Sequence, residues 1–414
     1  MPFLYSFAVA VAKAMTPVVA KSDKTKAFVA GRKALWTQLK GIPQNKKVVW
    51  MHCASLGEYE QGLTVLSALK NNHPEHFYLV TFFSPSGYEA SKNHGVADLV
   101  TYLPWDTRAD VKRFVALVNP VMALLVKYEF WPNIIRELQR KEVRLYLIAG
   151  LFRQNQRFFK PWGNGQRKLL REFAHLFVQN EASLKLMQSI GVQQVSVSGD
   201  TRFDRVGASK EPFAFMDTFV GARKCIVAGS SWPEDEALLA EAISKTPKDW
   251  CWLIAPHEMH EAKLNHLMTQ LPKGSLRYTQ NEEAAFDGSP VLVLDTVGML
   301  GRSYPYASLA YVGGGMGTAG LHNILEPAAE GVPVVIGKNY NRFTEAKDLI
   351  ALGGVISVAT PEGCSQQLLA LIENDSMRSQ KGAINKQYVL EHQGATQKTL
   401  TLLQKALSFD KDDG

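Results

Sequence analysis

Cysteine is scarce in this chain of 414 residues, and no Cys-x-x-Cys pair is present. The four cysteines are too scattered for a disulfide framework or a cysteine zinc site. They are Cys53, Cys225, Cys251 and Cys364. We therefore expect reduced thiols, no metal site and no cofactor. Internal repeats and low-complexity tracts are also missing, and a chain of this length has room for two ordinary domains with separate cores.

Acidic residues are nearly missing from residues 1–50, which carry nine Lys or Arg against the single acid Asp23. This local excess is larger than the net charge of +7 of the whole chain, so the remaining residues are close to neutral. Proteins that bind nucleic acid usually carry a basic face on the folded body, so this distribution argues against a nucleic-acid partner. It favours an amino-terminal segment that meets an anionic surface.

The first 20 residues are mostly apolar but are interrupted by Lys13 and Pro17, which makes them marginal as a membrane span. Basic residues follow the apolar stretch, the reverse of their order in a secretory signal peptide. Apolar side chains recur at helical spacing, at Phe3, Leu4, Phe7, Val11 and Met15. Two interpretations stay open, a helix lying in a membrane interface and a first helix packed on the domain. The charge favours the first, so residues 1–47 are predicted to associate with a membrane.

Short apolar runs alternate with amphipathic stretches of helical length, a pattern typical of parallel sheets covered by helices. Strands are expected at 46–54, 77–83, 98–104, 122–127, 144–149, 175–179 and 195–199, then at 224–230, 250–256, 290–295, 309–315, 332–337 and 355–358. The fold class is therefore α/β, with two Rossmann-like parallel-sheet domains facing a central cleft. The domains are predicted at 48–205 and 223–395, with a linker at 206–222 and a helix and tail at 396–414. Ligands of such sheets bind beyond the carboxyl ends of the strands.

The segment 51–62 runs from an apolar strand into Ser55, Gly57 and Glu58 before a helical pattern begins. Glycine permits a tight turn from strand to helix, which would place Glu58 at a helix amino terminus facing the cleft. A carboxylate there can act as a general base, although the helix dipole stabilises its ionised form and lowers its basicity. The position also suits a residue that only caps the helix, and the local sequence leaves both roles open.

A glycine-rich loop follows the strand that ends at Val312. Its glycines are Gly313, Gly314, Gly315, Gly317 and Gly320. The backbone amides of such a loop can approach an anion, and a helix predicted over 322–329 would point at it, so a phosphate-bearing ligand is expected. Glu326 on that helix is placed to accept hydrogen bonds from a ribose diol. The loop has no Walker lysine and does not fit GxGxxG, so neither a P-loop NTPase nor an ordinary NAD enzyme is supported.

Several short motifs occur in order along the chain. They are ASLGE at 54–58, SPSG at 84–87, YLPWD at 102–106, KYEFWPN at 127–133, GDTRFD at 199–204, GSSWPEDE at 229–236 and AGLHNILEPA at 319–328. Together they resemble the motifs of the 3-deoxy-D-manno-octulosonic acid (Kdo) transferase family of lipopolysaccharide biosynthesis, whose members are GT-B glycosyltransferases. The resemblance implies an inverting transfer of Kdo from CMP-Kdo to a lipid A precursor, lipid IVA. It also implies a peripheral or singly anchored enzyme at the cytoplasmic face of the inner membrane.

The resemblance assigns roles to individual residues. Glu58 would be the general base, and Glu129 would support the acceptor side. The CMP-Kdo donor would be held by Arg202, Ser230, Ser231, His257, Gly315, His322, Asn323 and Glu326. We also expect Ser55, Gly57 and Ser86 to bind the acceptor, together with Arg153, Arg157 and Lys160 of the basic segment described below. No metal is implied, because cations and helix ends would neutralise the donor phosphate.

Three positions depart from the family's motifs. Arg202 stands where the family has a lysine, which keeps the charge but changes its geometry. Many members have Pro-Arg-His-Pro-Glu where this chain has Ala-Pro-His-Glu-Met-His, so His257 or another cation must replace the arginine. Lys127 replaces the first acid of the family's Glu-x-Glu element. The donor-phosphate contacts of the loop around His257 are therefore expected to differ from those of the family.

The segment 151–171 carries six Lys or Arg, four aromatic residues and no acid. Interleaved basic and aromatic residues suit a lipid acceptor that bears phosphates near a bilayer. A solvated basic helix is the alternative. The near-neutral body argues against RNA as the partner of this segment.

Two other functions fit parts of the pattern. Another GT-B enzyme that uses a UDP-sugar, such as a lipid-linked N-acetylglucosaminyltransferase or a sugar epimerase, would share the fold and the glycine-rich loop. A two-domain protein that only binds a small ligand would also share the architecture, but would be expected to have a signal peptide. The co-occurrence of ASLGE and LHNILEP favours the Kdo transferase.

Overall fold

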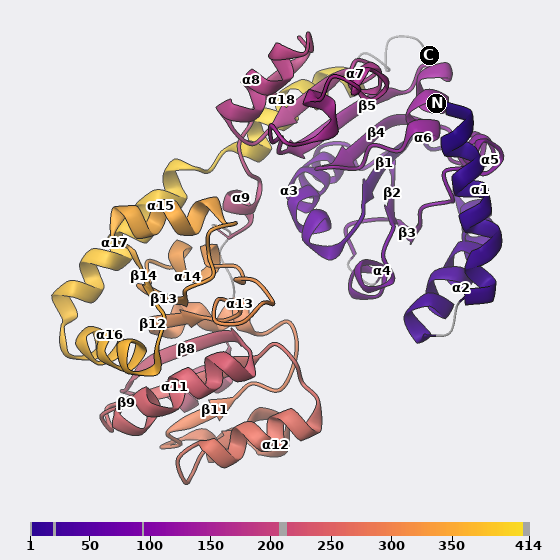
Figure 1. The fold of residues 1–414 in the computed structure, drawn as a ribbon. Coiled ribbons are helices and arrows are strands. Elements are labelled where there is room, and N and C mark those ends of the chain that lie inside the picture. The colour runs from indigo at the N-terminus through magenta and orange to yellow at the C-terminus, as the bar shows by residue number, and fades with distance from the viewer. Residues whose placement is uncertain (1, 20–21, 93–94, 207–212, 409–414) are drawn as a thin grey trace. The chain divides into compact units, whose positions relative to one another are not determined.

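The computed structural model describes residues 2–19, 22–92, 95–206 and 213–408, and the side chain of Phe3 lies outside the described part. The chain forms two compact units (Figure 1). The amino-terminal unit comprises residues 1–205 together with 393–414, and the carboxy-terminal unit comprises residues 206–392. Within the predicted linker, residues 207–212 lie outside the described residues, whereas Ala214–Val220 form helix α10.

The amino-terminal unit is built on seven parallel strands in the order β3-β2-β1-β4-β5-β6-β7. They are β1 (Val48–Cys53), β2 (Phe77–Phe82), β3 (Leu99–Tyr102), β4 (Pro120–Val126), β5 (Arg144–Gly150), β6 (His175–Val178) and β7 (Val195–Val197). Every residue of β1 is buried, because helices cover both faces of this central strand. The chain adds strands in one direction from β1 and in the other from β4. These two strands therefore flank the topological switch point, where ligands of open α/β sheets bind.

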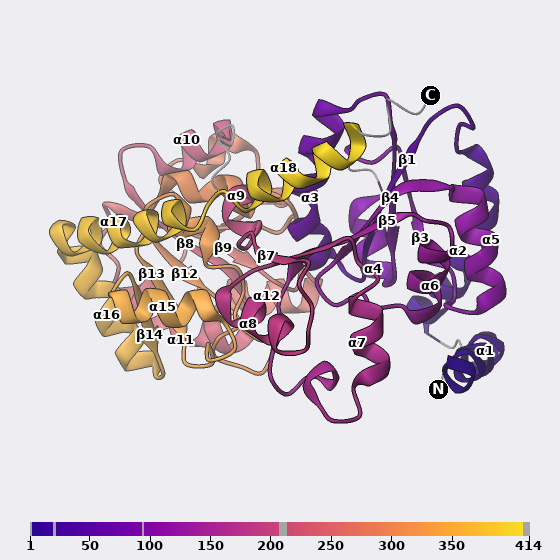
Figure 2. The ribbon, with the colours of Figure 1, turned by 90° about the horizontal axis from the view of Figure 1, so that it is seen from above.

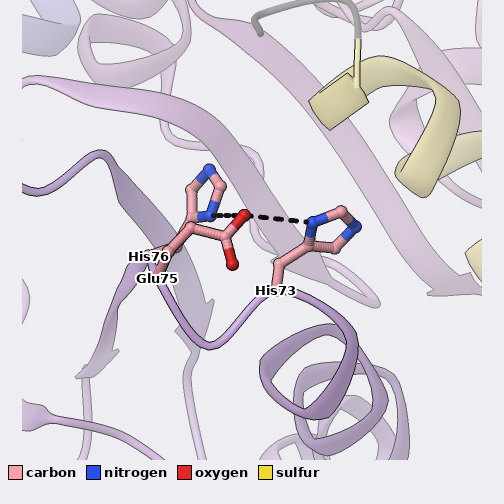
Figure 3. Close-up of side chains that lie close together, drawn as sticks. All are labelled: His73, Glu75 and His76. Atoms are coloured by element: carbon pink, nitrogen blue, oxygen red, sulfur yellow. Dashed lines mark ion pairs between the residues drawn. The ribbon is translucent and has the colours of Figure 1, made fainter.

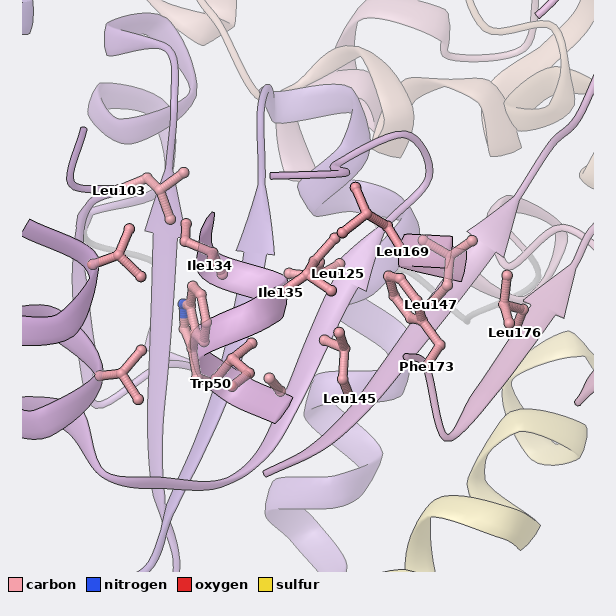
Figure 4. Packing of buried hydrophobic residues seen from close by; sticks show 14 of the residues in the cluster. Trp50, Leu103, Leu125, Ile134, Ile135, Leu145, Leu147, Leu169, Phe173 and Leu176 are labelled. Atoms are coloured by element: carbon pink, nitrogen blue, oxygen red, sulfur yellow. The ribbon is translucent and has the colours of Figure 1, made fainter. Parts of the chain in front are cut away.

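Helices cover both faces of this sheet. They are α1 (Pro2–Val19), α2 (Asp23–Gln38), α3 (Leu56–Asn72), α4 (Pro85–Ser91), α5 (Arg108–Val118), α6 (Pro132–Arg140), α7 (Asn164–Leu170), α8 (Glu181–Ser189), α9 (Arg202–Val206) and α18 (Ala395–Ser408). Side chains alternate along β1, so Trp50 packs on one face and Met51 on the other. Figure 4 shows the core on the Trp50 face, where Leu125, Ile134 and Ile135 gather.

The opposite face is closed by α3 together with α18, the last helix of the chain. Leu400, Leu403 and Leu407 of α18 are buried in the same core as Met51. The two helices lie side by side in Figure 2. Asp204 fixes the start of α18, because its carboxylate accepts hydrogen bonds from the amides of Gly394 and Thr396 at 2.6 Å each. The end of the chain thus completes the amino-terminal unit.

Helix α1 contacts this unit through polar side chains. Tyr5 donates its hydroxyl to Asp106 Oδ2 at 2.9 Å, and Lys13 pairs with Asp110 at 2.6 Å. Large apolar side chains of the same helix are exposed, namely Leu4, Phe7, Val11 and Met15. In the described part of the chain, no helix is both long and apolar enough to cross a bilayer. The helix therefore packs on the domain, as one interpretation of this segment predicts. Its stripe of exposed apolar side chains is the feature on which the other interpretation, a helix in a membrane interface, depends.

The carboxy-terminal unit repeats the plan with a second sheet in the order β10-β11-β9-β8-β12-β13-β14. Its strands are β8 (Lys224–Ser231), β9 (Trp250–Pro256), β10 (Leu276–Arg277), β11 (Val291–Val293), β12 (Ala307–Val312), β13 (Val334–Gly337) and β14 (Val355–Val358). Its helices are α10, α11 (Pro233–Lys245), α12 (Glu261–Gln270), α13 (Leu300–Ser303), α14 (Leu325–Ala329), α15 (Thr344–Leu352), α16 (Pro361–Glu373) and α17 (Asp375–Glu391). The switch point here lies between β8 and β12. The predicted α/β class with two parallel sheets is confirmed.

Candidate active site

Two carboxylates occupy the switch point of the amino-terminal unit. Glu58 lies in the first turn of α3, which follows β1, and Glu129 lies between β4 and α6. Because β1 and β4 are neighbours in the sheet, their carboxyl ends bring both acids to the same edge. This edge is where we place the candidate chemistry of the unit.

Glu58 is half-buried and accepts one hydrogen bond at Oε2, from the amide of Ala54 at 2.5 Å. Burial, and then the negative charge of Glu129, raise the pKa of Glu58. The bond from Ala54 lowers it, but by less. Desolvation by the surrounding protein is therefore the largest effect on this carboxylate, and the net shift is opposite to the one expected from the helix dipole alone.

Glu129 is held in place by a chain of hydrogen bonds. Its Oε2 accepts from Trp131 Nε1 at 2.7 Å and contacts His52 Nε2 at 3.0 Å. His52 Nδ1 lies 2.9 Å from the hydroxyl of Thr81, which itself accepts from Trp50 Nε1 at 2.9 Å. His52 Nδ1 also lies 2.9 Å from the backbone carbonyl oxygen of Thr81, so the ring connects Thr81 to the carboxylate of Glu129. The contacts of Oε2 thus hold the side chain of Glu129 in place.

His52 is the functional candidate that the sequence prediction missed. It is fully buried in the middle of β1, and nothing in its spacing distinguishes it from a core residue. The only signal available is a histidine inside an otherwise apolar strand. Such a residue needs hydrogen-bond partners when it is buried, and here they connect it to the carboxylate of Glu129.

Cations surround this pair of acids. Lys127 has a left-handed backbone (φ 64°) at the end of β4, and its ammonium group is largely buried. Burial, and then the positive charge of Arg202, lower its pKa. Arg202 donates to Asp200 Oδ2 from Nε and Nη2 at 2.9 and 2.7 Å. Arg202 is predicted to bind the donor and Arg153 to bind the acceptor. Both lie in the amino-terminal unit, close enough to Lys127 to lower its pKa.

The predicted acceptor residues Ser55, Gly57 and Ser86 are exposed at the amino termini of α3 and α4. A side chain at Gly57 would meet no atom within 4 Å, and its backbone is helical, so the turn does not require glycine. The predicted structural reason for Gly57 is thus wrong. The missing side chain instead leaves open space beside Glu58. Gly87 is the constrained glycine, because a Cβ there would lie 2.6 Å from the ring of Phe82.

The basic segment 151–171 is not a single helix. It passes through a short 3-10 turn at Arg157–Phe159 and then forms α7. Together with α1 and α6 it lines a pocket of about 910 Å³. The pocket gathers Arg136, Arg157, Lys160, Lys168 and the exposed Trp162, and Glu172 also lines it. Arg157 and Lys160, both predicted to bind the acceptor, therefore line the same pocket. Arg153, predicted to bind the acceptor as well, lies near Lys127.

In the carboxy-terminal unit, the switch point is organised by Asp235, a second residue that the sequence prediction did not assign. Its buried carboxylate accepts from the amides of Trp232 at 3.0 Å and Gly314 at 2.8 Å, and from the hydroxyl of Tyr311 at 2.7 Å. Burial raises its pKa despite these bonds. Asp235 therefore ties the start of α11 to the glycine-rich loop after β12.

The glycines of that loop allow close backbone approach. A Cβ on Gly313 would lie 2.3 Å from the carbonyl oxygen of Ser230, and one on Gly314, where φ is +86°, would lie 2.2 Å from that of Gly320. A Cβ on Gly315 would lie 3.0 Å from the backbone of Gly337. The following helix is shorter than predicted, because α14 begins at Leu325 and has five residues. Its dipole is correspondingly small, so the loop amides are the better candidates for contacting an anion.

Two predicted donor residues, His257 and His322, form a stack with Trp232. The rings of Trp232 and His257 lie 4.7 Å apart at an interplanar angle of 21°, and those of His257 and His322 lie 4.5 Å apart. Trp232 Nε1 donates to His322 Nε2 at 3.1 Å, so the neutral ring of His322 carries its proton on Nδ1. Burial, and then the charge of His257, lower the pKa of His322 to about 4. The ring of His322 is therefore uncharged at neutral pH, and burial lowers the pKa of His257 as well.

The remaining predicted donor residues lie around the same switch point. Ser230 has a left-handed backbone (φ 53°) at the end of β8. Ser231 is buried and donates its hydroxyl to Glu236 Oε1 at 3.0 Å, which leaves that hydroxyl engaged within the protein. Asn323 Oδ1 accepts from the amide of Leu325 at 3.1 Å, and Glu326 lies half-buried in the first turn of α14.

The chain is similar in sequence to known proteins. Residues 30–205 match the family model described as 3-deoxy-D-manno-octulosonic-acid transferase (kdotransferase). A 3-deoxy-D-manno-octulosonic acid transferase from Haemophilus influenzae is 26% identical over 377 residues, which cover 87% of each chain. One from Bordetella pertussis is also 26% identical and covers 86% of each chain.

Solved structures with low identity share the fold. UDP-GlcNAc 2-epimerase from Neisseria meningitidis, bound to UDP-GlcNAc, has a TM-score of 0.59 at 15% identity and covers 87% of this chain and all of its own. Acinetobacter baumannii MurG has a TM-score of 0.53 at 14% identity, with 87% and 99% covered. The two parallel sheets thus have the GT-B fold, and over most of its length the chain is similar in sequence to 3-deoxy-D-manno-octulosonic acid transferases.

Proposed function

We propose that the protein is an inverting glycosyltransferase that moves Kdo from CMP-Kdo to a lipid A precursor, lipid IVA. The observation that carries the proposal is Glu58, a half-buried carboxylate with a raised pKa at the switch point of the amino-terminal unit. A stronger carboxylate base is what the activation of a sugar hydroxyl requires. Relatives in the family bear the name of this transfer.

In the proposed reaction, Glu58 takes the proton of the acceptor hydroxyl as that oxygen bonds to the anomeric carbon of Kdo. The bond between this carbon and the phosphate oxygen of CMP breaks at the same time, and CMP leaves with the electron pair. Glu129 orients the acceptor, because its position is fixed by His52 and Trp131. Lys127 offsets the negative charge that two neighbouring acids would otherwise concentrate.

The donor is proposed to bind to the carboxy-terminal unit. The glycine-rich loop offers backbone amides to the phosphate, and His322 offers Nδ1–H as a neutral donor. Glu326 is proposed to accept from the ribose diol. Ser231 is a weaker candidate for the phosphate than the sequence predicts, since its hydroxyl already bonds to Glu236. A neutral histidine stack in place of the family's arginine distinguishes this donor site.

The acceptor is proposed to reach Glu58 from a membrane surface. The pocket of Arg136, Arg157, Lys160 and Lys168 has the charge and the apolar rim to hold phosphates of a lipid. The apolar stripe of α1 is suited to lie in the interface next to it, with anionic lipid attracting the basic amino-terminal segment. We therefore propose a peripheral location at the cytoplasmic face of the inner membrane.

The test is to incubate purified protein with CMP-Kdo and tetra-acylated lipid A precursor and to follow CMP release and acceptor mass by mass spectrometry. We expect both products with wild-type protein and neither with UDP-GlcNAc as the donor. Turnover of UDP-GlcNAc without turnover of CMP-Kdo would replace this proposal with a UDP-sugar enzyme, the function of the fold neighbour from Neisseria meningitidis.

A further inference from the structure

The turn between α3 and β2 holds two histidines and a glutamate that the proposed reaction does not use. His73, Glu75 and His76 project toward one another from four consecutive residues (Figure 3). His73 ends α3, and β2 begins directly after His76. The cluster therefore lies at the carboxy-terminal end of α3, whereas Glu58 lies in the first turn of the same helix. The part of α3 between Glu58 and the cluster is about 20 Å long at 1.5 Å per residue.

The three side chains are arranged as ligands of one ion would be. His73 Nδ1 and His76 Nδ1 each lie 3.5 Å from the same carboxylate oxygen, Glu75 Oε1. All three ligand atoms lie within 4.8 Å of one another. Ligands bound at 2.0–2.1 Å in a tetrahedral zinc site are about 3.3–3.4 Å apart, close to both contacts with Glu75. The two imidazole nitrogens, which lie within 4.8 Å of each other, would have to approach to about the same separation to complete the set.

The burial of the histidines points in the same direction. His73 is 9% exposed and His76 is 4% exposed. In the described structure, His73 Nδ1 makes no hydrogen bond, although buried polar groups normally have one. Its nearest polar contact is Glu75 Oε1, at ion-pair distance. A bound cation would supply the missing interaction for this nitrogen.

The backbone of the turn is fixed before any ion arrives. The amide of His73 donates to the carbonyl of Leu69 at 2.8 Å. The hydroxyl of Tyr78 donates to the carbonyls of Leu69 and His73 at 2.9 and 3.0 Å. Pro74 restricts the backbone between the first two ligands. Little conformational entropy would therefore be lost on binding.

We propose that His73, Glu75 and His76 form a binding site for a divalent transition metal of the zinc class. Two imidazoles and one carboxylate suit zinc, cobalt or nickel, whereas magnesium and calcium prefer oxygen ligands alone. The side chain of Glu75 is about half exposed, so a water molecule can occupy a fourth position. The ion would fasten the end of α3 to the start of β2, far from Glu58. The proposal is independent of the proposed transfer reaction.

The test is a titration of the full chain, freed of metal by a chelator and carrying no histidine tag, with Co²⁺ and then with Zn²⁺ as competitor. Visible absorption of Co²⁺ reports a four-coordinate site with nitrogen and oxygen ligands. We expect one equivalent to bind and Zn²⁺ to displace it. Glu75→Gln preserves size and should weaken binding at least tenfold, as should His73→Ala. His266→Ala removes an exposed histidine of α12 and serves as the control, with no expected change.

Thermal unfolding gives a second readout. Zn²⁺ should raise the melting temperature of the wild-type chain and of His266→Ala, but not that of Glu75→Gln. If His73→Ala does not fold, Glu75→Gln still decides the question, because Glu75 is partly exposed and its loss leaves the core intact. Absence of Co²⁺ and Zn²⁺ binding by the folded wild type, or equal affinity in Glu75→Gln, would overturn the proposal. A preference for Mg²⁺ would also contradict it.

Discussion

Helices α3 and α11 occupy equivalent places in the two units but use their first-turn acids in opposite ways. Each helix follows the first strand of its sheet and begins at the switch point. In α3, Glu58 accepts a hydrogen bond from the amide of Ala54 and is only half-buried. In α11, Asp235 is fully buried and accepts three. The carboxylate of Glu58 is left available to a ligand, whereas that of Asp235 is engaged in hydrogen bonds within the protein.

This difference explains how one architecture can serve two tasks. Burial raises the pKa of both carboxyl groups, so a shifted pKa alone does not identify a base. The number of hydrogen bonds that each acid already accepts separates them. A group that can still take a proton from a substrate must have an uncommitted oxygen. By that criterion we place the proposed base in the amino-terminal unit and the proposed donor site in the carboxy-terminal unit.

The largest expected effect comes from Glu58→Gln, which keeps the shape of the side chain and removes the base. We expect turnover of CMP-Kdo to fall by about two to four orders of magnitude, the usual contribution of a positioned base. Binding of CMP, measured by calorimetry, should stay nearly unchanged, because the proposed donor residues lie in the other unit. Retention of more than about a tenth of wild-type turnover would assign the proton to another group, and Glu129→Gln would be measured next.

Asp235→Ala should act on stability instead. The substitution leaves the hydroxyl of Tyr311 and the amides of Trp232 and Gly314 without their acceptor in a buried place. Losses of this kind cost about 1–3 kcal/mol for each unsatisfied group, so we expect a clear fall in the urea midpoint. Glu58→Gln should leave the free energy of unfolding within about 0.5 kcal/mol of wild type. If Asp235→Ala has the urea midpoint of wild type but loses turnover, Asp235 acts in the reaction and not in the fold. The contrast between the two acids would then be wrong.

The sequence predicts the sheets better than it predicts the site. Apolar runs reveal buried parallel strands because each strand must be hydrophobic on both faces. Strand β10 was missed, since its two residues are too short for any periodicity. His52 and Asp235 were missed for a different reason: each acts through partners that are distant in sequence, such as Glu129 for His52 and Tyr311 for Asp235. The docking of α18 on α3 depends in the same way on contacts that no local pattern encodes.

The histidine stack offers a pH test of the carboxy-terminal unit. The free protein holds His322 neutral down to its pKa of about 4, and a bound phosphate would favour the protonated ring and raise that pKa. CMP affinity should therefore increase as the pH falls through the pKa of the complex, by up to about tenfold per pH unit, and level off near pH 4. Calorimetry between pH 5 and 8 measures this.

The control for the stack is His322→Asn, since the phosphate of CMP itself also gains a proton near pH 6. Subtracting the profile of the variant removes that contribution. A difference profile that stays flat would mean that the phosphate does not sense His322, and would move the donor contact to the loop amides alone.

The smallest effect, and the sharpest comparison within one unit, comes from two glycines near Glu58. Gly57→Ala places a methyl group in open space on a helix, where alanine is favoured over glycine by about 0.5–1 kcal/mol. We therefore expect the variant to be as stable as wild type or slightly more stable. If the acceptor uses this space, its KM should rise by a few-fold while the KM for CMP-Kdo stays constant. Gly87→Ala is the opposite case, because its Cβ would meet the Phe82 ring at 2.6 Å and should destabilise the unit. Equal losses of stability in both variants would show that Gly57 serves the fold after all, and unchanged kinetics in a stable Gly57→Ala protein would place the acceptor away from the start of α3.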